Sequence, residues 1–264
     1  MRLFKHTPPL FRGFVQMKNR IISWFSCGAA SAVATKLAIA SDEAITVVYC
    51  EVEEEHPDNK RFLKDCENWF GQKIEILRNE TYKGSIYNVF QKNYMRTPNG
   101  SPCTRALKKQ VRLKYEKPTD RQIFGFTAEE VNRFDDFLDR NNGVDVWCPL
   151  IEKDLTKEDC LAMIANAGIE LPAMYKLGYQ NNNCIGCVKG GMGYWNKIRV
   201  DFPDQFKRMA DLEKEKGYTV LKKPDTSEPI FLHDLDPKRG NYPKEIEVQC
   251  GIFCTIAEQE YSPR

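Results

Sequence analysis

The strongest constraint on the fold is the regular alternation of short apolar runs with helix-forming segments in the first half of the chain. Residues 20–25 form an apolar, β-leaning run that breaks at 26–28 and continues over 29–40 as a segment rich in strong helix formers. The pattern continues with predicted strands at 44–50, 73–77 and 122–126 and predicted helices at 57–70, 85–94 and 104–115. Strands and helices that alternate in this way favour a parallel sheet with right-handed crossovers. The sequence therefore predicts an α/β fold, a Rossmann-like parallel sheet flanked by helices.

The chain divides into three parts by composition and pattern. Residues 1–17 contain two adjacent prolines and no clear periodicity, and are predicted to be an extension before the fold. The α/β pattern then occupies 18–150. Residues 151–264 are predicted to form a cysteine-bearing extension of helices and loops packed on that domain. Its first helix is expected over 156–167, with Thr156 as the capping residue.

Composition excludes several classes of protein. The chain has 39 Lys and Arg against 37 Asp and Glu, so its net charge of +2 gives no overall field that would attract nucleic acid or an anionic membrane. No apolar stretch reaches the roughly 18 residues that a membrane span needs, and the start lacks the apolar core of a signal peptide. We therefore expect a cytoplasmic protein without a membrane partner. In that setting the ten cysteines are expected to be thiols, metal ligands or redox groups rather than disulfides.

The turn between the first strand and the first helix has the composition of an anion-binding loop. Its six residues are Ser26, Cys27, Gly28, Ala29, Ala30 and Ser31. Because they lie where a strand ends and a helix begins, backbone N–H groups and the positive end of the helix dipole converge there. Small residues allow close approach to a phosphate or sulfate, and the two serine hydroxyls can add hydrogen bonds. The alternative is a plain tight turn that packs the helix on the sheet.

One close pair stands out among the cysteines. Cys184 and Cys187 have a Cys-x-x-Cys spacing in a loop rich in Gly and Asn, which lets two thiolates bind the same metal. Cys103 directly precedes a basic helix with Arg105 and Lys108, whose charges suit nucleotide phosphates or an anionic cluster. A solvated basic helix is the alternative. Four other cysteines lie in apolar patterns and are expected to be buried, namely Cys50, Cys66, Cys148 and Cys160.

An acidic loop follows the second predicted strand. It has glutamates at 51 and 53–55, followed by His56. In an open α/β sheet the carboxyl end of a strand is the edge where ligands bind, so Glu51 and His56 are candidates for nucleotide contacts. A solvated acidic turn is the competing interpretation of the glutamates.

Two segments carry a resemblance to a known family. The loop at 26–31 is similar to the S-G-G-x-D-S signature of PP-loop pyrophosphatases, although Cys27 replaces the first Gly and Ala30 replaces the Asp. The segment Q-C-G-I-F-C at 249–254 resembles the E-C-G-I/L-H segment that carries the catalytic cysteine of sulfonucleotide reductases. The chain thus resembles the PAPS reductase and PP-loop (adenine nucleotide alpha-hydrolase) superfamily, in the form found in phages and mobile elements.

The cysteine spacing extends this resemblance. The interval from Cys103 to Cys184 is close to that between the two cysteine pairs of the four-iron cluster in adenylyl-sulfate reductases, with Pro102 in place of one cysteine. Three ligands of such a 4Fe-4S cluster therefore match, and Cys250 is either the fourth ligand or the catalytic nucleophile. Cys254 is an alternative for either role. The absence of the flanking Glu and His favours the ligand role for Cys250.

The resemblance implies a HUP-type sheet with residues 18–150 as its nucleotide-binding domain. It implies an enzyme that binds ATP, APS or PAPS and carries out iron–sulfur-assisted sulfur or nucleotidyl chemistry, either as an oxidoreductase or as an adenylating ATP pyrophosphatase. Arg133 falls in the region that faces the nucleotide in this family. The full set of implied nucleotide-binding residues is Ser26, Cys27, Gly28, Ala29, Ser31, Glu51, His56, Arg105, Lys108 and Arg133.

Other functions stay open at this point. A PP-loop enzyme that thiolates a substrate or modifies nucleic acid would keep the same loop. A non-catalytic nucleotide sensor would keep the loop without turnover, and a structural protein stapled by zinc would use Cys184 and Cys187 as ligands. The expected partners are the adenine nucleotide, a thiol or redox electron donor, and in the second case a nucleic-acid substrate. The sequence leaves a homodimer open.

Overall fold

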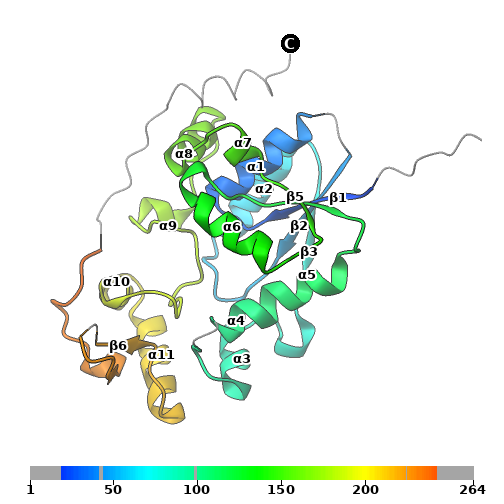
Figure 1. Ribbon diagram of the computed structural model, residues 1–264. Helices are drawn as coiled ribbons and strands as arrows, with labels where there is room; N and C mark the ends of the chain where they lie inside the picture. The colour runs from blue at the N-terminus through cyan, green and yellow to red at the C-terminus, as the bar shows by residue number, and fades with distance from the viewer. Residues whose placement is uncertain (1–18, 42–43, 98–99, 224, 243–264) are drawn as a thin grey trace, which may run out of the picture.

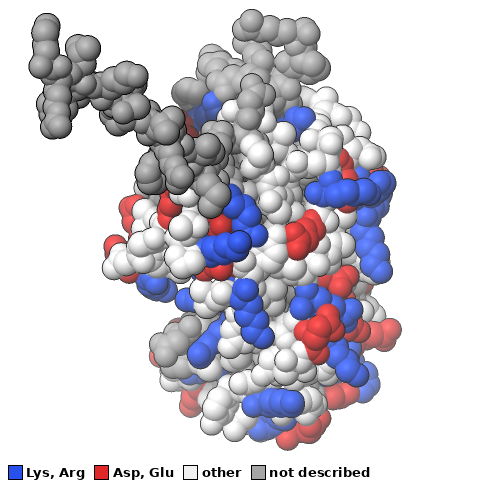
Figure 2. Space-filling model, turned by 90° about the vertical axis from the view of Figure 1, so that its right-hand side faces the viewer, with Lys and Arg blue, Asp and Glu red and all other residues white. Residues whose placement is uncertain are grey.

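The fold is described from a computed structural model, which covers residues 19–41, 44–97, 100–223 and 225–242 (Figure 1). The predicted N-terminal extension at 1–17 lies outside these residues. No helix within the described ranges combines the length and the apolar character that a membrane crossing requires. On the face that Figure 2 presents, cationic and anionic side chains are interspersed.

A five-stranded parallel sheet forms the centre of the fold. Its strands are β1 (Ile21–Phe25), β2 (Ile45–Cys50), β3 (Ile74–Leu77), β4 (Arg121–Ile123) and β5 (Asp145–Trp147). They lie in the order β3-β2-β1-β4-β5, and every neighbouring pair is parallel. The predicted Rossmann-like α/β fold is confirmed. The connections reverse direction between β1 and β4, so ligands are expected at the carboxyl ends of these two strands.

Helices cover both faces of the sheet. Successive side chains of β1 point to opposite faces, so they pack against different helices. Phe25 lies in a buried core with residues of α1 (Ala29–Ile39), α2 (Asn59–Phe70) and α8 (Lys157–Asn166). Trp24 points to the other face and makes an edge contact with Tyr115 of α5 (Gln110–Tyr115), with ring centroids 6.0 Å apart. The sheet and its first core thus place the turn between β1 and α1 at the carboxyl edge.

A second core lies beside the sheet domain and carries the cysteine-bearing segments. It combines α3 (Ile86–Lys92), α10 (Met192–Asp201) and α11 (Pro203–Lys216) with the apolar residues next to the Cys-x-x-Cys pair. The smaller elements are α4 (Pro102–Thr104), the π-helix η2 (Arg105–Lys109), α6 (Val131–Asp139), α7 (Pro149–Glu152), α9 (Ala173–Lys176), β6 (Leu221–Lys222), β7 (Pro229–Ile230) and the 3₁₀ turns η1 (Glu80–Tyr82), η3 (Ala128–Glu130) and η4 (Leu232–Asp234).

The two cores draw on both sides of residue 150. Helix α8 follows that position yet packs on α1 in the first core, whereas α3 precedes it and belongs to the second core. The division of the chain at 150 stays a prediction. The predicted cap of α8 is confirmed, because the Thr156 hydroxyl accepts a hydrogen bond from the Asp159 N–H at 3.1 Å within a capping box.

A buried carboxylate joins α11 to two later segments of the second core. Glu213 of α11 is fully buried and accepts hydrogen bonds from the Val220 N–H at 2.7 Å and from the Leu232 N–H at 2.6 Å. Burial raises the pKa of Glu213 from 4.5 to about 7, and the two N–H donors offset part of this shift. The side chain therefore links α11 to Val220, the residue before β6, and to η4.

Candidate functional site

The turn between β1 and α1, residues 26–31, is called the anion loop below, and its own side chains hold it closed. The Ser31 hydroxyl accepts the Ser26 N–H at 3.0 Å and donates to the Gly28 carbonyl at 3.0 Å. Cys27 has a left-handed φ of 56°, which turns its side chain into the buried core while its carbonyl faces the neighbouring loop. Ser31 and Cys27 therefore shape the loop, and the exposed Ser26 hydroxyl, which shares a hydrogen bond of 3.0 Å with the Ser31 hydroxyl, is its polar group on the surface.

The first turn of α1 lies against the exit of β4. A Cβ atom on Gly125 would lie 2.7 Å from the Ser31 backbone nitrogen, so only glycine fits at that position. The Tyr175 hydroxyl accepts the Ala29 N–H at 3.3 Å, while burial raises the pKa of this phenol to about 12. Because the first N–H groups of a helix have no partner within the helix, this end of α1 keeps donors for an anion at the predicted switch point of the sheet.

A buried polar cluster lies behind the anion loop. The Glu55 carboxylate, which is 7 % exposed, accepts hydrogen bonds from the Tyr49 hydroxyl at 2.5 Å and from the Asn59 amide at 2.9 Å. Its other oxygen pairs with the Lys108 ammonium at 3.1 Å. Burial lowers the pKa of Lys108, but the neighbouring Glu55 charge and Cys184 raise it by more, so the net shift is upward. Glu55 is thus a structural anion and not part of a solvated turn.

Asn182 connects this cluster to the loop that carries the Cys-x-x-Cys pair, residues 180–191, called the cysteine loop below. Its amide nitrogen donates to the Cys27 carbonyl at 2.6 Å and to the Asn59 side-chain oxygen at 2.8 Å. Three residues after Asn182, the Ile185 N–H donates to the Glu54 carbonyl at 2.8 Å. The Asn182 side-chain oxygen is buried and has no hydrogen-bond partner among the described residues. The cysteine loop is therefore joined directly to the anion loop.

Tyr194 holds the cysteine loop from the other side. Its hydroxyl accepts the N–H groups of Gly186 at 3.1 Å and Cys187 at 2.9 Å, and it donates to the Cys184 carbonyl at 3.1 Å. The neighbouring Trp195 is fully buried. Both rings are therefore buried anchors beneath the loop.

The structure brings three of the predicted metal ligands into one region. Cys184 interacts electrostatically with both Cys187 and Cys103, and all three pack on the second core. Burial and the Glu55 charge raise the pKa of the Cys184 thiol, and burial and Cys187 raise that of Cys103. Three thiols packed on the same core have the residue type that a four-thiolate cluster requires. Within the described ranges, however, no group of three or more Cys, His, Asp or Glu side chains is arranged to hold a metal ion.

The remaining predicted ligands, Cys250 and Cys254, lie outside the described residues. The last described residue, Tyr242, is close to the cysteine loop, because its hydroxyl accepts the Gln180 N–H at 3.0 Å and its ring lies 6.1 Å from that of Tyr194. Since an extended chain advances about 3.5 Å per residue, the length of sequence from Tyr242 to Cys250 is enough to reach the three thiols. The role of Cys250 stays a prediction.

The other predicted nucleotide contacts are spread around the edge of the sheet. Glu51 pairs with Arg78 at 3.5 Å, and His56 accepts the Asp58 N–H at 3.1 Å, while burial lowers its pKa. Arg133 is exposed, pairs with Glu130 and lies over the Phe126 ring that follows β4, at 5.3 Å from the ring centroid. Arg105 is exposed on η2. Of these predicted nucleotide-binding residues, only Lys108 belongs to the buried polar cluster around Glu55, which adjoins both loops.

All four cysteines that were expected to be buried lie within the described residues. Cys66, Cys148 and Cys160 are buried as predicted, whereas Cys50 at the end of β2 is only half-buried. Burial raises the pKa of the Cys50 thiol to about 11.

Sequence reasoning missed the residues that join the two loops. Asn182 lies in a run of three asparagines, and nothing in that run distinguishes it from its neighbours. Tyr175 follows an apolar segment and reads as core, and Glu55 stands among other glutamates. A buried polar side chain cannot be told from an exposed one by residue type alone, so no signal in the sequence identifies these three.

Comparisons with known proteins identify a family and a similar solved structure. Residues 20–190 match the family described as the phosphoadenosine phosphosulfate reductase domain. The crystal structure of phosphoadenylyl-sulfate (PAPS) reductase from Candida auris, a phosphate complex, is similar at 12 % sequence identity, with a TM-score of 0.48 over 62 % of this chain and 80 % of that one. No curated protein matches the sequence significantly.

Proposed function

Because the chain belongs to the phosphoadenosine phosphosulfate reductase domain family, we propose that it is a sulfonucleotide reductase-like oxidoreductase that binds adenylyl sulfate (APS) or its phosphorylated form (PAPS). The observation that carries the proposal is the contact between the two loops. Asn182 donates to the Cys27 carbonyl at 2.6 Å and stands two residues before Cys184. A nucleotide at the anion loop would therefore have its reacting sulfur beside a group of thiols.

The nucleotide is proposed to lie across the carboxyl ends of β1 and β4. The Ser26 hydroxyl and the backbone N–H groups at the start of α1 would bind its phosphate or sulfate oxygens. The buried and unpaired side-chain oxygen of Asn182 is an acceptor that suits a ribose hydroxyl or an adenine amine. Arg133, near the exit of β4, is proposed to contact the phosphates. Ala30, at the position of the Asp in the ATP-cleaving signature, favours a sulfonucleotide over ATP.

Cys103, Cys184 and Cys187 are proposed to bind an iron–sulfur cluster together with Cys250. Their electrostatic contacts with one another support this ligand set, and Lys108 beside Cys184 offsets part of the negative charge that thiolates bring. Such a cluster, when bound, would be anionic, so it would need nearby cations such as Lys108 to lie beside a bound sulfonucleotide. All eight cysteines within the described ranges are free thiols, which supports a reducing, cytoplasmic setting.

If Cys250 is the nucleophile instead, the chemistry can be written for this chain. Its thiolate would attack the sulfur of the bound sulfonucleotide, and the bond between that sulfur and the phosphate oxygen would break, so that the nucleotide leaves as AMP or its 3′-phosphate. The cysteine would then carry an S-sulfonate. A thiol or redox-protein donor would supply the two electrons that release sulfite and restore the thiol.

Anaerobic purification of the full chain tests the metal proposal. A brown protein with iron and sulfide, which binds adenylyl sulfate more tightly than ATP, is the expected result. Colourless protein with stoichiometric zinc would indicate a structural zinc site instead of a cluster. Tighter binding of ATP than of adenylyl sulfate would indicate ATP pyrophosphatase-type thiolation. A nucleotide that binds without turnover would indicate a sensor.

A single substitution separates the two roles of Cys250. In the Cys250→Ser variant, loss of iron with weakened turnover identifies a ligand, whereas retention of iron with abolished sulfite release identifies the nucleophile. Cys160→Ser is the matched control, because Cys160 is fully buried in the first core. It should leave the iron content unchanged if it folds.

A further inference from the structure

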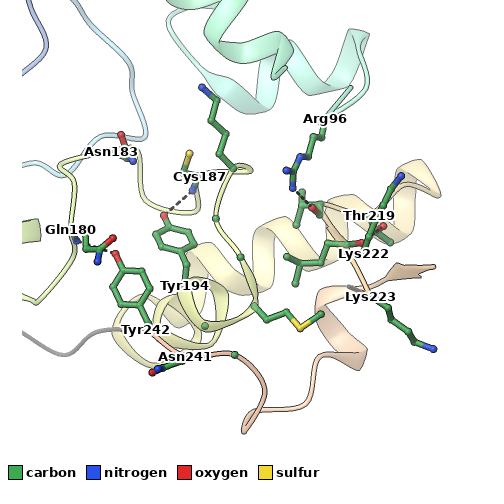
Figure 3. A pocket seen from close by; sticks show the side chains of 18 of the residues that line it. Arg96, Gln180, Asn183, Cys187, Tyr194, Thr219, Lys222, Lys223, Asn241 and Tyr242 are labelled. Carbon is green, nitrogen blue, oxygen red and sulfur yellow. Dashed lines mark hydrogen bonds between the residues drawn. The ribbon is translucent and has the colours of Figure 1, made fainter. Parts of the chain in front are cut away.

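A large cavity lies beside the cysteine loop, outside the proposed nucleotide site. Its volume is about 1160 Å³, and the described residues that line it come from three separate stretches of the chain. The first stretch contains Arg96, the second runs from Gln180 to Tyr194, and the third includes β6 and the last described residues. Figure 3 shows Cys187 and Tyr194 on one side of this space and Arg96 and Lys222 on the other.

The charges that line the cavity are all of one sign. Arg96, Lys189, Lys222 and Lys223 belong to its lining, and no Asp or Glu is among the described residues that line it. Lys223 pairs with Glu228 at 2.6 Å, but the other three have no carboxylate partner among the described residues. The chain as a whole is nearly neutral, and the two signs of charge are interspersed on the face in Figure 2. A cavity with cations alone is therefore a local departure from the surface around it.

Backbone forms much of the remaining wall. The segment from Gly190 to Gly193 leads into α10, whose N-terminus adds positive potential. A Cβ atom on Gly240 would lie 2.2 Å from the Gly193 nitrogen, so the two glycines let two stretches of lining backbone touch. Cys187 and Lys189, two residues apart in the cysteine loop, both line the cavity. The cationic wall is thus continuous with the cysteine region.

We propose that this cavity binds a second, phosphate-bearing ligand, separate from the nucleotide at the anion loop. Unpaired cations from three segments around one open space suit several phosphates in succession rather than one. The volume exceeds the roughly 300–1,000 Å³ that holds a drug-sized ligand, so there is room for more than a mononucleotide. Cys187 on the same wall places this ligand next to the thiols, where it would be the acceptor or regulator of the chemistry there.

Binding to the full-length chain tests this proposal with two probes. A fluorescent single-stranded oligonucleotide of about six nucleotides reports a nucleic-acid source of the phosphates. Inorganic pyrophosphate as a competitor reports a small-molecule source. Contact with three phosphates predicts that the affinity of the oligonucleotide falls about 20-fold between about 50 and 200 mM salt. Binding of either probe supports the site and identifies its source.

Variants decide whether the ligand lies in this cavity. Lys222→Ala should weaken binding several-fold and reduce the salt slope by about 0.7, because one phosphate contact is lost. Arg96→Ala should do the same. Lys214→Ala is the matched control, since Lys214 is an exposed lysine on α11 that does not line the cavity. It should leave binding unchanged.

Parallel binding of adenylyl sulfate keeps this inference distinct from the proposed function. Unchanged adenylyl sulfate affinity in Lys222→Ala, with weakened oligonucleotide or pyrophosphate, supports a second site. Failure of both probes to bind, equal loss in the Lys214→Ala control, or displacement of the probes by adenylyl sulfate would overturn it. If the probes bind but adenylyl sulfate does not, the proposed function is overturned and the second site stands.

Discussion

The anion loop and the cysteine loop are shaped by different kinds of contact. In the anion loop, Ser31 closes the turn onto residues at most five positions away. The cysteine loop is held by Tyr194 on one side and by Asn182 on the other, and through Asn182 it is attached to the anion loop itself. A locally closed loop should keep its shape when distant contacts are removed. The cysteine loop should lose its geometry first.

The largest effect is expected at the junction of the two loops. Glu55→Ala leaves the buried Tyr49 hydroxyl and Asn59 amide without their acceptor and removes the counter-charge of Lys108. We expect the free energy of unfolding to fall by about 4 kcal/mol, measured by urea denaturation, with loss of both metal and nucleotide binding. Glu53→Ala, at an exposed residue of the same loop, should change it by less than about 0.5 kcal/mol. Equal effects of the two substitutions would argue against the junction.

A smaller effect, with a pH dependence, is expected in the second core. The pKa of Glu213 is raised from 4.5 to about 7, so between these values the folded state holds a proton that the unfolded chain has lost. The free energy of unfolding should therefore fall as the pH rises, by about 3 kcal/mol between about pH 5 and 8. Glu213→Gln should remove this slope. Glu215→Gln, at an exposed neighbour, should retain it.

The sheet domain should respond to pH with the opposite sign. Arg20 holds the pKa of the buried Asp120 carboxylate below its usual range, against the effect of burial. This contribution to stability is present above the ordinary pKa of Asp and is lost as the pH falls through the depressed value. Hydrogen exchange at low pH should therefore show opening near β4 before it shows opening around α11. Opening around α11 before β4 would contradict the opposite pH responses expected for the sheet domain and the second core.

A moderate effect is expected from the anchor of the cysteine loop. Tyr194→Phe removes the acceptor of the Gly186 and Cys187 N–H groups, which lie in a buried setting. We expect a loss of about 2 kcal/mol in the free energy of unfolding and weaker metal binding, whereas nucleotide affinity stays unchanged. Iron content and adenylyl sulfate titration measure the two properties separately. Tyr218→Phe, at an exposed tyrosine, is the control.

The smallest effect is expected in the anion loop. Ser26→Ala removes an exposed hydroxyl but keeps the Ser26 N–H bonded to Ser31. Adenylyl sulfate affinity should fall about 5-fold, which corresponds to about 1 kcal/mol, with iron content and stability unchanged. Loss of iron in this variant would show that the two loops are less independent than their contacts indicate.

The sequence by itself determined the parallel sheet, the turn at its carboxyl edge and the residue types of both loops. These follow from hydrophobic periodicity and from small residues between a strand and a helix, and both signals are local. Thr156 and its capping box were predictable for the same reason. The cysteine spacing also predicted that Cys103 and the Cys184 pair lie in one region, because the resemblance supplied the long-range information.

Only the tertiary structure decided which polar residues are buried between the loops and which cations face one cavity. Glu55 and Glu53 have the same side chain, yet one is buried with three donors and the other is exposed. Arg96 and Lys222 are far apart in the sequence and line the same space. The energy of a buried charge depends on the partners that surround it, and residue type alone carries no record of those partners.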